Sequence, residues 1–121
     1  MFDTYKEGQK MKIEKSSNIK KNPVEIEGAK DVDIRWLISK EDGAENFALR
    51  MFEVQPGGHT PLHTHPQEHE VFIIEGRGTL VYEGQEYDFD AEHTIFVPPN
   101  QEHRFMNTGD SLLRMLCIIP I

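Results

Sequence analysis

Short apolar runs separated by turn residues occupy most of the chain. Seven segments are rich in Val, Ile, Phe, Tyr, Leu or Met, and several alternate apolar and polar positions as half-buried strands do. Turn residues separate them about every 8–12 positions, and no helical periodicity extends beyond about two turns. The pattern predicts strands at Asp33–Ser39, Phe47–Val54, Glu70–Glu75, Thr79–Tyr82, Glu86–Phe89, Thr94–Val97 and Leu112–Ile118.

These strands predict an all-β fold. Short antiparallel strands in a chain of 121 residues have to bury one face of a sheet against another sheet. The alternatives are a sandwich and a jelly-roll barrel of two antiparallel sheets, and the pattern alone does not separate them. Turns are predicted at residues 41–43, 56–58, 76–78, 83–84, 98–100 and 108–110, where Gly, Pro, Asn and Asp concentrate.

Length and composition predict one domain without membrane segments. No stretch approaches the roughly 18 apolar residues of a membrane span, and the N-terminus has no apolar signal core. The single cysteine, Cys117, has no internal partner for a disulfide. We therefore expect a cytoplasmic protein that does not contact a membrane.

Charge divides the chain into two parts. The formal net charge is −8, yet seven of the eight lysines lie in the first thirty residues. From Asp31 onward, six Lys and Arg against sixteen Asp and Glu give a net charge of −10. Such an acidic body repels phosphate backbones, so we expect no nucleic-acid partner. We interpret residues 1–30 as a polar, Lys-rich N-terminal segment, of which 1–10 are an optional extension if translation starts at Met11, and 31–121 as the barrel.

Four of the six histidines have the spacing of a metal site. His63 and His65 lie on the same face of an extended segment, because side chains in a strand repeat every two residues. A bend after His65 returns the chain toward the same cavity, and a Pro-rich turn later delivers His103. Neutral imidazole is a common ligand of first-row transition metals. The pattern therefore predicts a metal site built from His63, His65, His103 and either His69 or Glu70.

The same residues resemble the two motifs of the cupin superfamily. The first motif is Gly, five residues, His-x-His, three or four residues, Glu and a later Gly. It is matched by Gly57, His63, His65, Glu70 and Gly76. The second motif is matched by Pro98, His103 and Asn107, with Glu92 and Asn100 at its two glycine positions. The resemblance covers about Asp33 to Ile121 and implies a double-stranded β-helix, that is, a jelly-roll barrel.

The resemblance also implies a ligand set. The usual third ligand of the family, in chain order, is Glu, here Glu70, but the run Pro-Gln-Glu-His-Glu at 66–70 resembles that of small cupins with a four-histidine site. The implied ligands are His63, His65, His69 and His103, with Glu70 as the alternative to His69. The implied cofactor is one divalent transition metal per chain, Mn, Fe, Ni, Cu or Zn, with Mn or Fe favoured.

Four further residues are predicted to line a substrate pocket. Cupin barrels place one face of the last strand against the metal cavity. We assign Met115 and Cys117 to that face, since the opposite assignment would force Arg114 into the barrel. Phe105 follows the last metal ligand by two residues. Arg50 is the only basic residue in its strand and either anchors an anionic substrate or lies on the outer face.

The predicted site favours chemistry on an anion. Four imidazoles are neutral, so a dipositive ion keeps its charge, and an octahedral ion keeps two positions open. We predict a metal-dependent enzyme for a small organic substrate, either an oxygenase or an isomerase or lyase acting through a metal-bound enolate, with a dioxygenase-like oxygenase favoured if the protein is catalytic. The alternative is a non-catalytic barrel that binds a small molecule or is stabilised by its metal. Edge strands such as Asp33–Ser39 favour a homodimer.

Overall fold

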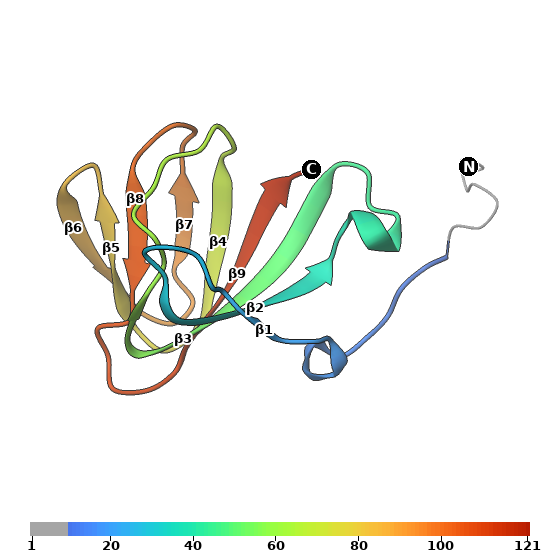
Figure 1. The fold of residues 1–121 in the computed structure, drawn as a ribbon, viewed down its shortest axis with the longest axis horizontal. Coiled ribbons are helices and arrows are strands. Elements are labelled where there is room, and N and C mark those ends of the chain that lie inside the picture. The colour runs from blue at the N-terminus through green and yellow to red at the C-terminus, as the bar shows by residue number, and fades with distance from the viewer. Residues whose placement is uncertain (1–9) are drawn as a thin grey trace.

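The structure is a computed structural model that describes residues 10–121. It is an antiparallel, curled β-barrel, which confirms the all-β jelly-roll prediction (Figure 1). Regular helix in residues 10–121 is limited to two 3-10 turns, η1 (Ser16–Asn18) and η2 (Lys40–Asp42), and no helix there is long and apolar enough to cross a membrane. The strands are β1 (Asn22–Pro23), β2 (Lys30–Ile38), β3 (Phe47–His59), β4 (His69–Glu75), β5 (Gly78–Tyr82), β6 (Gln85–Phe89), β7 (Thr94–Val97), β8 (His103–Met106) and β9 (Leu113–Pro120).

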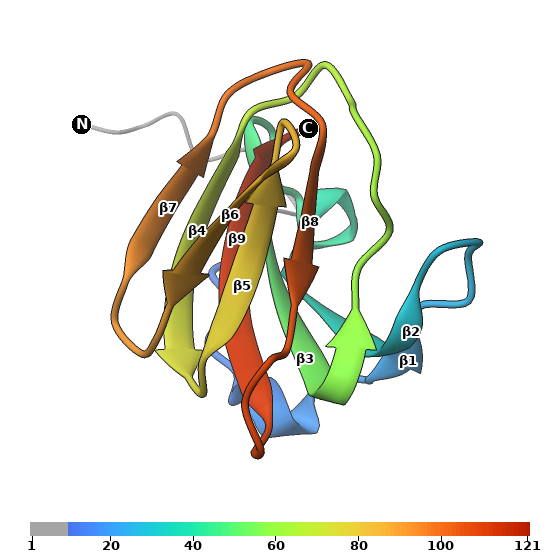
Figure 2. The ribbon, with the colours of Figure 1, turned by 90° about the vertical axis from the view of Figure 1, so that its left-hand side faces the viewer.

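One continuous sheet forms both halves of the barrel. Its strand order is β6-β5-β8-β3-β9-β4-β7, and β2 pairs with β3 and with the short β1. The first part of β3 pairs with β9 and its last residue pairs with β8, so β3 joins the two halves. Figure 2 shows the half containing β5, β6 and β8 in front of the half containing β4 and β9. The core between them combines buried residues of both halves: Leu80, Phe89 and Phe105 with Ile73, Leu113 and Met115.

A bend inside β3 replaces one predicted turn. We predicted that the strand ends at Val54 and that residues 56–58 form a turn, but β3 continues through them to His59. Gly57 has a φ of +83°, and a side chain on Gly58 would lie 2.6 Å from the carbonyl oxygen of Lys30. The two glycines thus let the strand bend against β2 without ending. Strands β1 and β8 were not predicted either.

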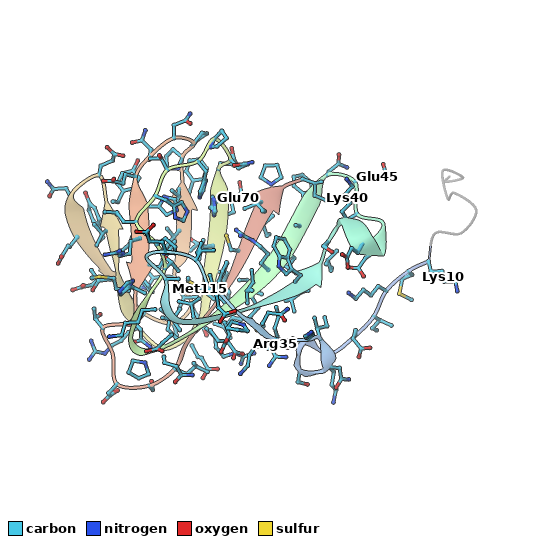
Figure 3. The ribbon with its side chains drawn as sticks, viewed as in Figure 1. Lys10, Arg35, Lys40, Glu45, Glu70 and Met115 are labelled. Atoms are coloured by element: carbon cyan, nitrogen blue, oxygen red, sulfur yellow. The ribbon has the colours of Figure 1, made fainter. Side chains whose placement is uncertain are left out.

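The N-terminal segment is attached to the outside of the sheet from residue 12 onward. The Arg35 guanidinium donates to the carbonyl oxygens of Ser16 and Ile19 at 3.2 and 2.6 Å, and Figure 3 shows Arg35 beside η1. The nearly buried carboxylate of Glu53 is 3.6 Å from Lys21 Nζ. Because β1 also pairs with β2, the sheet includes residues that the sequence placed before the barrel. The first nine residues of the predicted N-terminal segment lie outside the described residues.

The outer edge of β2 has no pairing strand over most of its length, although Val24 N and Lys12 Nζ donate to its carbonyl oxygens at Val32 and Leu37. Strand β1 covers only Asp33 and Ile34, and beyond them no strand within residues 10–121 pairs with this edge. Trp36 and Ile38 are 44% and 42% exposed there. An exposed apolar edge strand is a site for pairing with another chain. We propose that two copies of the protein pair along this edge to form a homodimer.

A charge on this edge should disrupt the dimer. We expect the parent protein to have twice the chain mass by light scattering during size-exclusion chromatography, and Ile38→Lys to shift it toward the monomer, because the pairing edge would then carry two buried ammonium groups. The control is Tyr87→Lys on β6, an exposed apolar residue on another strand. A parent protein that is monomeric across a wide concentration range would contradict the proposal.

Candidate metal centre

Two backbone hydrogen bonds bring the histidine-bearing segments together. His63 N donates to His103 O at 3.2 Å, and His103 N donates to His63 O at 3.1 Å. Asn100 N donates to His65 O at 2.9 Å, so the segment that contains His63 and His65 is hydrogen-bonded at both histidines to the segment that contains Asn100 and His103. His63 and His65 alternate with the exposed residues between and beside them, as predicted. Both rings therefore face the same side as His103.

Three histidines converge on one point. The ligand nitrogens of His63, His65 and His103 lie within 4.8 Å of one another. Nitrogens bound to one ion at about 2.1 Å are at most about 4.2 Å apart, so small ring rotations bring all three to ligand distance. Nε2 of His65 is buried and has no hydrogen-bond partner. Such orphaned atoms are rare, and a bound cation would satisfy this one. The three residues, hereafter the histidine triad, fit a divalent transition metal.

Backbone carbonyls orient the triad. His103 Nδ1 is 2.9 Å from the carbonyl oxygen of Gln101, and His65 Nδ1 is 3.2 Å from that of Gln67. His63 likewise hydrogen-bonds to the backbone two residues before it. A ring N–H that donates to a carbonyl leaves the other nitrogen with its lone pair, which is the arrangement of metal-ligating histidines.

His69 lies next to the triad, but its nitrogens make different contacts. Its ring stacks on His65 with centroids 4.1 Å apart, and its Nε2 is 3.1 Å from His65 Nδ1. Its Nδ1 is 3.2 Å from Cys117 Sγ and 3.4 Å from Arg50 Nη2. The structure thus supports a three-histidine centre, and the fourth histidine ligand stays a prediction.

Glu70 points away from the cavity. In β4, buried and exposed positions alternate, with His69 buried and Glu70 exposed. The Glu70 carboxyl interacts with that of Glu68, which raises the pKa of Glu68. A groove on the outer face of the sheet, lined also by Phe72 and Phe96, contains Glu70. The alternative ligand therefore lies on the face opposite the triad.

Burial keeps the imidazoles neutral. Desolvation, together with the nearby charges of His65 and Arg50, lowers the pKa of His69 to about 3. Desolvation is also the main cause that lowers the pKa values of His63 and His65. Because a metal binds the neutral imidazole, protons compete weakly for these nitrogens.

The triad opens into a cavity of about 540 Å³. All four residues predicted for the substrate pocket line it, and Phe105, Met115 and Cys117 are buried; Figure 3 labels Met115 between the two halves of the barrel. Arg50 faces the cavity rather than the outer side. Their role toward a substrate stays a prediction. Most of the remaining wall is apolar: Val32, Ile34, Phe52, Val71 and Ile119.

The loop between β1 and β2 forms a part of the wall that sequence reasoning missed. Val24, Glu25 and Ile26 line the cavity, and Gly28 packs closely against Pro61 at the start of the histidine segment. These residues precede the predicted barrel and belong to a polar segment. Their alternation is too short to predict a strand, so no feature of the sequence indicated this position.

One family model and several known proteins match this chain. A family model described as "Cupin domain" matches residues 50–119. The solved polyketide cyclase RemF from Streptomyces resistomycificus is 35% identical with a TM-score of 0.87, over 92% of this chain and 80% of that one. Polyketide synthase CurC from Streptomyces cyaneus is 30% identical over 69% of this chain and 56% of its own length. The oxalate-binding protein of Thermotoga maritima is 29% identical over 94% of this chain and 97% of its own length.

The relatives differ in length and in their named activities. The chain spans about half the length of the first curated relatives that it matches. Their names describe a cyclase, a synthase and a binding protein. The likeness thus extends to the barrel, while the reaction and the substrate have to be argued from the cavity.

Metal retention should rank the candidate ligands. We expect His63→Ala, His65→Ala and His103→Ala each to lose the metal on dialysis, measured by inductively coupled plasma mass spectrometry. His69→Ala should weaken retention about 10- to 100-fold, as loss of a ligand or of its hydrogen-bonded neighbour does. Glu70→Gln is the matched control and should retain the metal, since Glu70 lies on the outer face. Weaker retention in Glu70→Gln than in His69→Ala would instead indicate a three-histidine, one-glutamate site.

The metal-free protein should lose stability in mild acid. In the folded state the pKa of His69 is about 3, against 6.5 for an ordinary histidine. The unfolded chain therefore binds more protons below about pH 6.5, and stability falls from there toward pH 3 by up to about 1.4 kcal/mol per pH unit for this group. Urea unfolding at about pH 7.5 and about pH 5 measures the loss. His69→Gln should reduce it, whereas His93→Gln, an exposed histidine outside the cavity, should not. Equal losses in all three proteins would refute this.

Proposed function

This chain belongs to the cupin family, and on that premise we propose that it is a metal-dependent enzyme for a small, largely apolar organic substrate. The observation that carries the proposal is the position of the histidine triad. Its three rings face a cavity of about 540 Å³ whose other walls are mainly apolar. A cavity of this size and lining is typical of small-molecule sites.

The lining residues have distinct roles in this proposal. The triad would hold a divalent ion, which would supply Lewis-acid stabilisation of a negatively charged substrate oxygen. Arg50 adds a second positive charge on the same cavity. Phe105 and Met115, both buried, exclude water and contact the apolar part of the substrate. Imidazole ligands by themselves do not select one first-row metal, and of Mn, Fe, Ni, Cu and Zn we favour Mn or Fe as the ion to be tested first.

Cavity size favours an aromatic or alicyclic substrate, which we propose reacts through an enolate in an isomerase, lyase or cyclase reaction. A two-carbon dianion would leave most of the cavity empty, whereas an aromatic or alicyclic molecule fills it. The relatives named as a polyketide cyclase and a polyketide synthase support a substrate with carbonyl groups on an apolar body. An oxygenase would hold its substrate through the same substrate oxygen, and the experiment below separates the oxygenase reaction from the enolate reaction.

A non-catalytic binding protein is the second candidate. Among the lining residues, Glu25 is the only carboxylate, and it belongs to the loop between β1 and β2. The cavity thus offers few groups that transfer a proton. One relative over nearly its full length is named as a binding protein. The two candidates differ in whether a bound ligand changes chemically.

Solvent-deuterium exchange tests the proposal. The probe is phenacyl alcohol, which carries adjacent carbonyl and hydroxyl oxygens on an apolar aryl group. We expect the Mn²⁺-loaded protein to exchange the carbon-bound protons between these oxygens at least about tenfold faster than the free ion does, as measured by proton NMR in D₂O. Exchange should stop in His103→Ala and persist in His93→Ala.

Three other outcomes have defined meanings. Dioxygen uptake that depends on the probe, measured with an oxygen electrode, would show an oxygenase in place of enolate chemistry. Saturable binding of the probe without exchange or uptake would support the non-catalytic candidate. Exchange that is equally fast in His103→Ala would show that the triad takes no part, and the proposal would be wrong.

A further inference from the structure

The Arg50 guanidinium places a positive charge on the wall of the cavity. It lies on β3 between Trp36 on β2 and Cys117 on β9, its partners in the two neighbouring strand pairs. Its guanidinium carbon is 5.0 Å from the centre of the Phe52 ring and 5.6 Å from that of Trp36. These distances are within the range of cation–π contacts. The aromatic rings therefore fix the position of the cation at the cavity wall.

No carboxylate in the described residues neutralises this cation. Arg50 Nη2 donates to Cys117 Sγ at 3.0 Å, and sulfur is a weak acceptor. Arg50 Nε is buried and has no hydrogen-bond partner. In contrast, Arg35 and Arg114 both contact the Glu53 carboxylate, at 3.8 and 3.5 Å. A partly buried guanidinium without an anion is costly, because its desolvation is not compensated.

The cavity contains the space that an anion would need. Apart from Arg50, the charged side chain lining it is Glu25, and the rest are apolar residues, the histidines, Thr60 and Gln67. Because imidazoles bind a metal as neutral ligands, the bound metal would add positive charge and no negative one. The positive charges of Arg50 and of the metal both favour a ligand with a negatively charged group.

From these contacts we infer that Arg50 binds the carboxylate of the ligand, so that the natural ligand is a small organic acid with an apolar body. The inference rests on the proposed function, because it names the ligand class of the same cavity. The guanidinium presents planar N–H donors that match a carboxylate, and the Phe52 and Val71 side chains contact the apolar body. A neutral molecule of the same shape would leave the cation unpaired.

Fluorescence of the single tryptophan reports on this site directly, since Trp36 lies 5.6 Å from the guanidinium. The probes are benzoate and its neutral analogue benzamide, each titrated into metal-free and Mn²⁺-loaded protein. In both forms we expect benzoate to bind at least about tenfold more tightly than benzamide, which is the contribution of one charged hydrogen bond. Arg50→Gln should lose that preference, and Arg50→Lys should keep part of it. Arg77→Gln, an exposed arginine outside the cavity, is the matched control.

Each outcome separates this inference from the proposed function. A benzoate preference in the metal-free parent protein supports the inference even if deuterium exchange fails. A preference that appears only with Mn²⁺ and survives in Arg50→Gln would show that the metal alone binds the carboxylate, and the inference would be overturned. Equal binding of benzoate and benzamide to the parent protein overturns it without any variant, so the test does not depend on the folding of Arg50→Gln.

Discussion

The candidate centre depends on the paired backbone hydrogen bonds between His63 and His103. This bridge holds the segment after β3 beside β8, so that the histidine side chains of the two segments face the same point. Below it, Thr60 N donates to Phe105 O, and the Asn107 side chain donates to Val54 O and Ser111 O, both at 2.8 Å. The segments that carry the two histidine motifs are therefore joined by one ladder of hydrogen bonds, and this backbone geometry determines where the imidazoles lie.

Electrostatics inside the barrel differs from that of the whole chain. The chain has a formal charge of −8, yet the cavity combines neutral imidazoles with an arginine that has no carboxylate partner within residues 10–121. Surface charges are screened over about 8 Å at physiological ionic strength, whereas charges inside a cavity are screened much less. The acidic exterior therefore disfavours polyanions at long range, and Arg50 still favours a single small anion at contact.

Most of the sheet could be predicted from the sequence, because its strands alternate apolar and polar residues. The motif positions were also informative: Glu92 and Asn100, which stand at the two motif glycines, have φ values of +71° and +65°. Strand β8 was missed because only Phe105 and Met106 of its residues are apolar, and β1 because it has only two residues. The choice between His69 and Glu70 could not be made from strand parity, since the chain is irregular after His65 and β4 begins only at His69.

The number of histidine ligands and the charge on the cavity wall are linked through one contact. His65 Nδ1 donates to the Gln67 carbonyl and also faces His69 Nε2 at 3.1 Å, so Nε2 of His69 carries its lone pair in this arrangement. The His69 proton then lies on Nδ1, which donates to Cys117 Sγ, the same atom that accepts from Arg50 Nη2. Nε2 is therefore the His69 nitrogen that is available to a metal, because a protonated nitrogen does not bind one. An anion bound by Arg50 would leave the sulfur to His69 alone, and binding of an acid to the wall would thus favour the four-histidine state over the three-histidine state.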